Sequence, residues 1–267
     1  PQRINGMRVV LPVHPLNPNE ADDIFHEEYI CLKSLGINCS LFDYDSLGSD
    51  RFCPNPPIAC GEEVLYRGWM MNPDLYKKFV RLIEQKGGKA VTSFQSFIKT
   101  HHLPSWYQSC EKFTPETVFL PADNSLEVGA AALGWKSFFV KDYVKSNYDD
   151  RGSIAHSPAE VVEIVNRIRE YRGGVEGGVS LRRVEEYLPE SEMRYFIMFS
   201  KAYSPGGEIP DIVKQVAGIV DVPFFSVDVI RRADGVLRVV ELGDGQVSDR
   251  KMWDTQHFCE MLAECAG

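Results

Sequence analysis

The order of apolar and polar positions divides the first hundred residues into strands and helices. An apolar run over 7–13 predicts a buried strand, and apolar residues at helical spacing over 21–35 predict a helix that Gly36 ends. The same reasoning predicts strands over 37–44, 63–70 and 89–93 and a second amphipathic helix over 73–85. Because strands alternate with helices, we expect a small parallel sheet.

The pattern changes in the middle of the chain. Residues 94–121 combine aromatic residues and prolines without a period, so we expect a linker between two domains there. Beyond it the pattern predicts a strand over 136–143, a polar loop over 144–157, helices over 158–172 and 211–219, and two strands over 224–232 and 236–243. Residues 1–6 precede the first methionine, Met7, and we expect them to be an appended segment.

Composition narrows the functional classes. The 267 residues carry a net charge of −9, which argues against an extended nucleic-acid footprint, although a local basic pocket remains open. No apolar run is long enough to span a membrane, and the sequence does not open on the basic-then-apolar pattern expected of a signal peptide. The seven cysteines have irregular spacing and no CxxC pair, which fits neither a disulfide scaffold nor a zinc site. We therefore expect a cytoplasmic protein with reduced thiols.

Two acidic residues flank a predicted hairpin near the end of the chain. Asp234-Gly235 is typical of a two-residue turn, and such a turn sets Asp228 directly opposite Glu241, with Cβ atoms about 5 Å apart. The alternation puts Val240 on the opposite, core face. Two carboxylates at that distance repel unless a cation compensates, and Mg²⁺ suits such a pair together with phosphate oxygens. The alternative is a solvated acidic pair on an outer strand.

With this hairpin, the sequence resembles the ATP-grasp superfamily, in which Asp and Glu on a late hairpin hold Mg²⁺ on ATP. RRVEEYLPESEMRYF resembles the hinge strand of that superfamily, and FFVKDY resembles the strand whose lysine reaches the α- and β-phosphates. The resemblance implies that ATP is held by Lys141, by Glu192 at the ribose, and by Asp228 and Glu241 through Mg²⁺. It places these residues at the adenine: Glu185, Glu186, Tyr187 and Leu188.

The resemblance also implies a fold and a domain division. It covers about 114–249, and the overall class is α/β: a small parallel-sheet pre-ATP-grasp domain over 1–98, followed by a two-lobed α+β ATP-grasp fold over 99–267. The lobes would span about 112–184 and 185–267. Within the superfamily the chain looks most like a compact bacterial and phage clade named for two arginines and a lysine.

The chain departs from the family pattern near the hairpin. The Asn that usually follows the second acid by two residues is Gly243, and the arginine often found two residues before the Asp is Ser226. The loop DYVKSNYDDRGS is less rich in glycine than a typical phosphate-covering loop. These departures bear on the metal geometry and the substrate more than on ATP binding.

Family chemistry implies that a carboxylate attacks the γ-phosphate and that an amine or thiol then displaces phosphate from the acylphosphate. Such transfer depends on cations that face the phosphates. We expect Lys141 to lie exposed at a cleft, so that Lys141→Ala would stop turnover and leave the fold intact. Arg194 would share a strand face with Glu192 and reach the γ-phosphate, or form a surface salt bridge. Lys145 and Arg151 could close on the phosphates or be solvated loop charges.

A third cation lies at the end of a predicted strand. Arg67 in YRGWMM would meet a substrate carboxylate beyond the carboxyl end of the parallel sheet, or pack in an Arg-Trp corner. His14 is a weaker candidate for the same pocket. We interpret His101 and His102 as linker structure, because adjacent strand residues point apart and no third ligand follows at a useful spacing. Trp106, Trp135 and Trp253 are expected to be packing anchors.

The prediction is an ATP- and Mg²⁺-dependent carboxylate–amine (or thiol) ligase. Its substrates could be small molecules, peptides or protein tails, with neither a membrane nor, by charge, nucleic acid as partner. The alternatives are a nucleotide-binding module without ligase activity and a phosphotransferase that stops at phosphorylation. If Asp228 and Glu241 repel in the apoprotein, Asp228→Asn and Glu241→Gln should keep or raise its melting temperature. The sequence leaves open the oligomeric state and the acid and amine substrates.

Overall fold

The computed structural model describes residues 6–144 and 152–266. The chain forms two compact units. The first contains the residues up to Ile98 together with 194–227 and 243–267, and the second contains 99–193 and 228–242. The chain therefore passes from one unit to the other four times, and the predicted domain division stays a prediction.

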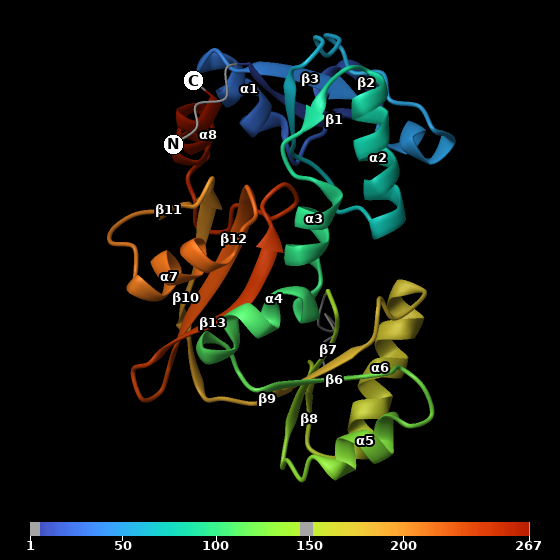
Figure 1. The fold of residues 1–267 in the computed structure, drawn as a ribbon, viewed down its shortest axis with the longest axis vertical. Coiled ribbons are helices and arrows are strands. Elements are labelled where there is room, and N and C mark those ends of the chain that lie inside the picture. Colours follow the sequence, from blue (N-terminus) through green and yellow to red (C-terminus); the bar gives the residue numbers. More distant parts are fainter. Residues whose placement is uncertain (1–5, 145–151, 267) are drawn as a thin grey trace. The chain divides into compact units, whose positions relative to one another are not determined.

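A mostly parallel sheet is the centre of the first unit (Figure 1). Strand β1 pairs in parallel with β3 and β4, and β4 pairs in parallel with β5, as the alternating pattern predicts. Strand β2 joins the other end of β1 in the antiparallel direction. The strands are β1 (Met7–His14), β2 (Asn17–Ala21), β3 (Asn38–Phe42), β4 (Glu63–Tyr66) and β5 (Lys89–Ala90).

Helices cover both faces of this sheet because successive strand residues point to opposite sides. Val9 and Leu11 of β1 pack in one buried cluster with Leu32 of α1 and Phe258 of α8. Val10 points the other way, into a second cluster that α2 covers. Figure 1 shows α1 and α8 beside each other. The helices are α1 (His26–Ser34), α2 (Pro73–Gln85) and α8 (Thr255–Ala266).

The predicted ends of these helices are partly correct. Helix α2 has the predicted bounds, because the Asn72 side chain accepts a hydrogen bond from the Leu75 amide at 2.9 Å and caps its first turn. Helix α1 begins at His26, five residues later than predicted, because the chain before it pairs with β1 as strand β2. Gly36 has a φ of 78°, as a residue just past a helix end requires.

The prediction of an irregular linker over 94–121 is wrong. Two helices and a strand occupy it, and their apolar side chains Phe97, Leu103, Trp106 and Cys110 are buried. Proline does not disturb the second helix, because Pro104 lies in its first turn, where the missing amide hydrogen has no helical partner. The elements are α3 (Phe94–His101), α4 (Leu103–Cys110) and β6 (Thr117–Leu120).

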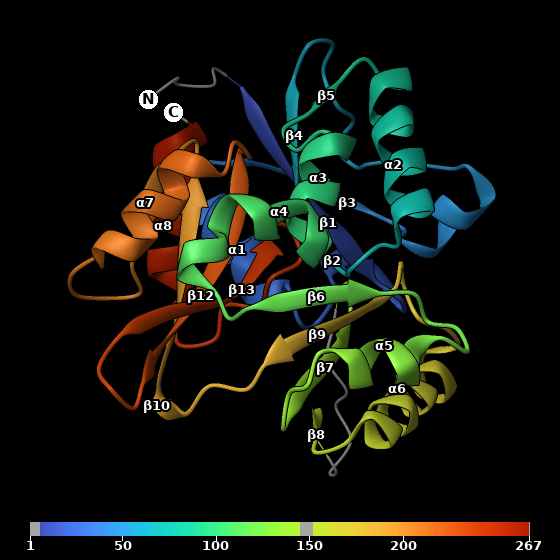
Figure 2. The same ribbon diagram turned by 60° about the horizontal axis from the view of Figure 1, so that its bottom comes forward.

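An antiparallel sheet in the order β6-β9-β7-β8 forms much of the second unit. Helices α5 and α6 pack on one face of it (Figure 2). Helix α6 has the predicted bounds, with the Ser157 hydroxyl accepting from the Glu160 amide at 3.2 Å and Gly173 at its end. The elements are α5 (Leu126–Ala132), β7 (Phe138–Asp142), β8 (Ile154–Ala155), α6 (Pro158–Arg172) and β9 (Val179–Arg183).

The third sheet has the strand order β11-β10-β12-β13, and β10, β12 and β13 each contain residues of both units. Strand β12 and helix α7 have the predicted bounds, and β13 begins and ends one residue later than predicted. The elements are β10 (Tyr187–Met198), β11 (Lys201–Tyr203), α7 (Asp211–Ile219), β12 (Phe224–Arg232) and β13 (Leu237–Asp244). All seven cysteines are free. In the described part of the chain, no helix is long and apolar enough to cross a membrane.

Candidate active site

The sheet of the second unit has one apolar face and one mixed face. Phe138 and Val140 of β7 are buried in the core cluster with helices α5 and α6. Because neighbours in a strand point to opposite sides, Phe139 and Lys141 lie on the other face. Strand alternation therefore separates the residues that fold this unit from those available to a ligand.

Strand β9 extends that mixed face. Its register pairs Phe139 with Arg182 and Lys141 with Ser180. Arg182 is buried, and its guanidinium donates to the Thr117 hydroxyl at 3.3 Å, to the Val240 carbonyl at 2.5 Å and to the Thr114 hydroxyl. Arg182 thus fixes the position of β13 against this sheet within the second unit.

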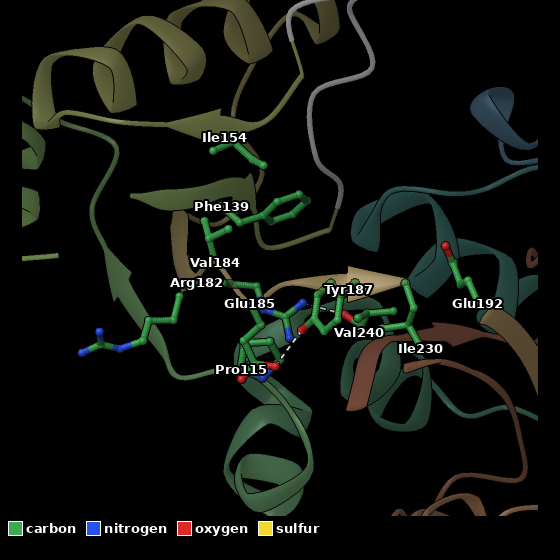
Figure 3. Close-up of a pocket in the computed structure, with 11 residues that line it drawn as sticks. Pro115, Phe139, Ile154, Arg182, Val184, Glu185, Tyr187, Glu192, Ile230 and Val240 are labelled. Carbon is green, nitrogen blue, oxygen red and sulfur yellow. Dashed lines mark hydrogen bonds between the residues drawn. The ribbon is translucent and has the colours of Figure 1, made fainter. Parts of the chain in front are cut away.

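A hollow of about 250 Å³ lies over this face (Figure 3). This volume is near the small end of ligand pockets, and its walls are largely apolar, as small-molecule sites usually are. In Figure 3, Phe139 and Ile154 lie on one side of the hollow and Tyr187 and Ile230 on the other. The lining residues are Pro115, Phe139, Ile154, Arg182, Arg183, Val184, Glu185, Tyr187, Glu192, Ile230 and Val240.

The predicted hinge contributes alternate residues to the hollow. Glu185 and Tyr187 line it, whereas Glu186 and Leu188 are exposed and are not among the lining residues. Arg238 donates two hydrogen bonds, of 2.9 and 3.0 Å, to the Glu185 carboxylate. The Tyr187 hydroxyl donates to the same carboxylate at 3.0 Å. These contacts fix the side chains of Glu185 and Tyr187 at the hollow.

Glu192, the predicted ribose ligand, also lines the hollow. Figure 3 shows it on the same side as Ile230 and far from Ile154. The structure therefore brings Glu192 together with Glu185 and Tyr187 around one hollow. Its contact with ribose remains a prediction.

Lys141 lies two residues along β7 from Phe139, which is about 7 Å along a strand. Its Nζ lies 3.5 Å from Oε1 of Glu241. The Lys141 side chain is only 5% exposed, whereas that of Glu241 is 43% exposed. The expectation that Lys141 is exposed is therefore wrong: its side chain is covered, and its ammonium group lies beside a carboxylate that is partly exposed to solvent.

The hairpin between β12 and β13 has a different turn from the predicted one. Arg232 donates from its amide to the Val236 carbonyl at 2.8 Å, and Gly235 donates to the Arg232 carbonyl at 2.8 Å. The turn therefore contains three residues, 233–235, with Gly235 at a φ of 90°. Asp234 and Gly235 form the turn as predicted, but Val236 faces Arg232 instead of Ala233.

An extra residue in β13 offsets this shift. At the far end of the hairpin the Gly245 amide donates to the Phe224 carbonyl at 3.3 Å. Arg232 is eight residues after Phe224, whereas Gly245 is nine residues after Val236, so β13 contains one bulged residue.

The burial pattern locates the bulge. Val239 and Leu242 are buried and the two residues between them are not, which breaks the alternation at Val240–Glu241. A bulge there sets both residues opposite Asp228. The prediction that Val240 belongs to the core face is wrong, since it lines the hollow. The facing of Asp228 and Glu241 stays a prediction, which the bulge supports.

The two carboxylates of Asp228 and Glu241 suit a hard cation. Carboxylate oxygens are preferred by Mg²⁺, which usually keeps several waters and needs one or two carboxylates beside phosphate. The family's third ligand has no substitute at Gly243, where a Cβ would lie 2.8 Å from the Ser226 hydroxyl and 2.9 Å from that of Ser248. Those two hydroxyls bond to each other at 2.7 Å. Asp228 and Glu241 therefore fit Mg²⁺ as a two-carboxylate site.

Arg194 belongs to the first unit. Its side chain is 10% exposed and donates to the Asp249 carboxylate at 2.7 Å and to the Asp249 carbonyl at 3.0 Å. The indole of Trp253 donates to the Arg194 carbonyl at 2.9 Å. The predicted role of Arg194 at the γ-phosphate remains a prediction.

The structure gives Arg67 a different surrounding from the one predicted. Its guanidinium is buried, donates to both carboxylate oxygens of Glu28 at 2.9 and 3.0 Å, and donates to the Gly245 and Ser248 carbonyls at 2.7 and 3.0 Å. It also lies 4.8 Å from the centroid of the Phe258 ring. The expectation that Arg67 meets a substrate carboxylate is therefore corrected. Its guanidinium donates its hydrogen bonds inside the first unit, which is a structural role. The predicted alternative of a packed corner describes Arg67 better, with Phe258 in place of a tryptophan.

The remaining candidates are His14, two loop cations and the tryptophans. His14 accepts a hydrogen bond from the Leu16 amide at 3.1 Å, and its Nε2 lies 3.8 Å from Asp23. Lys145 and Arg151 lie outside the described residues. Trp106 and Trp253 are buried, as predicted for packing anchors.

The structure contradicts both reasons for interpreting His101 and His102 as linker structure, since they do not lie in a strand and a third candidate ligand is near them. Their Nε2 atoms lie 2.9 and 2.8 Å from the same oxygen of Glu176, a third candidate ligand that sequence spacing did not reveal. Burial raises the pKa of Glu176, but the hydrogen bonds from both histidines outweigh it and lower the pKa to about 2. The two adjacent histidines converge because helix α3 ends at His101 and His102 is extended, with φ −102° and ψ 122°.

Sequence reasoning missed most of the apolar walls. Phe139 and Ile230 lie two residues from Lys141 and Asp228, so strand alternation alone could have assigned them to the site. No signal in the sequence pointed to Val240 and Arg182, because the place of Val240 depends on the bulge and that of Arg182 on a buried hydrogen-bond network.

A second hollow of about 310 Å³ lies between α5 and α6, on the helical side of the same sheet and away from Lys141.

A comparison with protein families finds a match for most of the second half of the chain. Residues 132–262, which include Lys141, the hinge and the hairpin, match an ATP-grasp domain family, the third family of the clade named for two arginines and a lysine. Over these residues the chain is similar to that family. The predicted resemblance is thereby confirmed, and a search of curated proteins found none that matches the chain.

Solved structures show a similar fold over nearly the whole chain. A RimK-domain ATP-grasp protein from Sphaerobacter thermophilus is 15% identical, with a TM-score of 0.63 over 97% of this chain and 99% of that one. The D-cycloserine synthetase DcsG is 15% identical, with a TM-score of 0.62 over 98% and 99%. The ATP-grasp ligase PsnB, complexed with minimal precursor, Mg and ADP, is 13% identical, with a TM-score of 0.59 over 97% and 98%. The predicted α/β fold class is confirmed.

Proposed function

We propose that this chain is an ATP- and Mg²⁺-dependent ligase that joins a carboxylate to an amine. The observation that carries the proposal is the face shared by Phe139 and Lys141 in the second unit. An apolar hollow lies at Phe139, and the Lys141–Glu241 ion pair follows along the same strand. A nucleotide whose base lies in the hollow would extend its phosphates toward Lys141.

Each residue has a role that follows from its position. Glu185 and Tyr187 would bound the adenine, with Glu192 accepting hydrogen bonds from the ribose hydroxyls. Lys141 would donate to the phosphates once they compete for its ammonium group. Asp228 and Glu241 would hold Mg²⁺, which supplies positive charge against the phosphate oxygens. Arg194 is proposed to meet the transferred phosphoryl group.

The reaction proposed here has two steps. A carboxylate oxygen of the acid substrate attacks the γ-phosphorus, the bond to the β-phosphate oxygen breaks, and ADP leaves. The amine nitrogen then attacks the acyl carbon, loses a proton, and expels inorganic phosphate. Phosphoryl transfer of this kind depends on position and charge, so no covalent catalyst from the chain is needed.

The solved structures support the reaction class without naming a substrate. Two of the similar proteins are described as an ATP-grasp ligase complexed with a precursor and as a D-cycloserine synthetase, so both peptides and small amino compounds occur as contexts for this fold. We propose an acid and an amine of either kind as the substrates of this chain.

An isotope experiment tests the proposal. Pools of carboxylic acids labelled with ¹⁸O, with and without pools of amines, would be incubated with the protein and Mg·ATP. A ligase transfers one ¹⁸O from the acid to inorganic phosphate, and its product forms only when the amine is present. ADP formation without ¹⁸O transfer would indicate a phosphotransferase or hydrolase, and nucleotide binding without ADP would indicate a binding module; either result contradicts the proposal.

A further inference from the structure

Two histidines and a glutamate, none of them among the residues proposed for catalysis, converge in the second unit. His101 ends α3, His102 precedes α4, and Glu176 lies in the loop between α6 and β9. Their ligand atoms, Nε2 of each histidine and one carboxylate oxygen, all lie within 4.8 Å of one another. The side chains of His101, His102 and Glu176 are 2%, 19% and 25% exposed, so the cluster is largely covered and two of its members remain partly exposed.

The backbone of Tyr143 forms hydrogen bonds with both segments that contain the cluster, the one next to His102 and the one at Glu176. Its carbonyl accepts from the Leu103 amide at 2.8 Å, next to His102, and its amide donates to the Glu176 carbonyl at 3.3 Å. The Glu176 amide donates to the Asp142 carboxylate at 3.3 Å. The three candidate ligands are therefore positioned by strand β7 and by the chain around it.

The loop that contains Glu176 is built to lie close to Tyr143. Gly177 has a φ of 76°, and a Cβ on it would lie 2.2 Å from Cδ2 of Tyr143. Gly178 is also close, with a Cβ position 2.8 Å from the Tyr143 hydroxyl oxygen. The Tyr143 ring in turn contacts the His102 ring, with centroids 6.1 Å apart. Glycines at these positions let Glu176 come within reach of both imidazoles.

The ligand chemistry selects a class of metal. Two imidazole nitrogens and one carboxylate are a common zinc set with one position left for water, whereas Mg²⁺ and Ca²⁺ prefer oxygen ligands. Bonds of about 2.1 Å in a tetrahedron place ligand atoms about 3.4 Å apart. The nitrogen–oxygen distances of 2.8 and 2.9 Å would have to open by about half an ångström, a small side-chain rotation.

We propose that His101, His102 and Glu176 form a binding site for one divalent transition-metal ion of the zinc class. The ion ties the junction between α3 and α4 to the loop after α6. This site is separate in chemistry from the Asp228–Glu241 pair, and it does not depend on the ligase activity.

Cobalt titration of the full-length protein tests the site. After dialysis against a chelator, the wild type should bind one Co²⁺ per chain, with the strong visible absorption of a tetrahedral ion and a rise in melting temperature. Zn²⁺ should displace the Co²⁺ stoichiometrically, while millimolar Mg²⁺ should not. Failure of the wild type to bind Co²⁺ or Zn²⁺ saturably would overturn the proposal.

Variants locate the metal. Glu176→Gln and His102→Gln should each weaken Co²⁺ binding by about 100-fold or more, because each removes one of three ligands. Glu176→Gln keeps an oxygen acceptor for the histidines, so its fold should survive, and circular dichroism checks this. His156→Gln is the matched control, because His156 is exposed and lies outside the cluster. Unchanged binding in both ligand variants, or an equal loss in the control, would refute the assignment.

Discussion

Two buried cations, Arg67 in the first unit and Lys141 in the second, were both expected to face a ligand. Arg67 donates four hydrogen bonds, two of them to Glu28, and stacks on Phe258. Among the described residues, the one ion-pair partner of Lys141 is Glu241, at 3.5 Å. The difference teaches that burial alone does not mark a catalytic cation. The informative property is how many of the cation's hydrogen-bond donors are already bonded to other groups of the protein.

Loss of Arg67 should produce the largest effect. Arg67→Met leaves Glu28 buried, with only Arg250 beside it at 3.1 Å among the described residues, and should lower the free energy of unfolding by about 3–5 kcal/mol. Urea unfolding measures this, with Arg81→Ala as a control, since Arg81 is 57% exposed and its surface pair with Asp50 should change stability by less than about 1 kcal/mol. A stable Arg67→Met protein that binds ATP but no longer ligates would restore Arg67 to the substrate site.

A buried acid near Arg67 gives a pH test of the same region. Burial raises the pKa of Asp244 to about 7, against the lowering effect of hydrogen bonds from Gln246. The native state then keeps a proton that the unfolded chain releases near pH 3.8, so the free energy of unfolding falls as pH rises from about 4 to about 7. The fall is at most about 4 kcal/mol.

Asp244→Asn should remove this pH dependence, while Asp211→Asn, at an exposed acid, should keep it. Unfolding by urea at pH 4 to 8 measures both variants. A wild type whose stability rises through this interval in step with the Asp244→Asn variant would show that Asp244 is ionised in the native state.

Substitution of Lys141 should affect activity much more than stability, in contrast to substitution of Arg67. Lys141→Met should reduce ATP-dependent ADP formation by about 100-fold or more, because a donor to the transferring phosphates is lost. Stability should change by about 1 kcal/mol, since methionine preserves the buried stem and Glu241 is partly solvated. Initial rates and thermal melts check both quantities, with the exposed Lys136→Met as the matched control. Full activity in Lys141→Met would remove the lysine from the proposed site.

The smallest expected effect concerns Glu241. The sequence alone predicted that Glu241→Gln would keep or raise the melting temperature of the apoprotein. The ion pair with buried Lys141 reverses that expectation, and the variant should be less stable by about 1 kcal/mol, a value reduced because Glu241 is 43% exposed. A double-mutant cycle with Lys141→Met isolates the pair. A higher melting temperature would show that repulsion from Asp228 is the stronger term.

Local periodicity was enough for elements whose ends are set by nearby residues. Helices α2 and α6 were predicted correctly because Asn72 and Ser157 cap them within the same segment. Strand β2 was missed because it depends on pairing with β1 and has no apolar pattern of its own. Residues 94–121 were misjudged as a linker because their prolines and aromatic residues are accommodated by burial in helices, which composition does not reveal.

The same limit applies to the site. Lys141, Glu185, Tyr187 and Glu192 were found from motif order, and the structure places the last three around one hollow. The partner of Arg67 is 39 residues away in sequence, and the partner of His101 is 75 residues away, so no spacing rule could connect them. The bulge at Val240–Glu241 was likewise invisible, because a bulge depends on the hydrogen bonds between two strands and not on the residues of one.

The four passages of the chain between the two units have a consequence for synthesis. Helix α8 shares a core cluster with β1 and α1, although more than 200 residues separate them along the chain. As the protein emerges from the ribosome, the apolar face formed by Val9, Leu11 and Leu32 therefore stays uncovered until Phe258 has been synthesised. During this interval the nascent chain is exposed to aggregation and to chaperone binding. Shortening the chain before Thr255 should leave that face uncovered permanently.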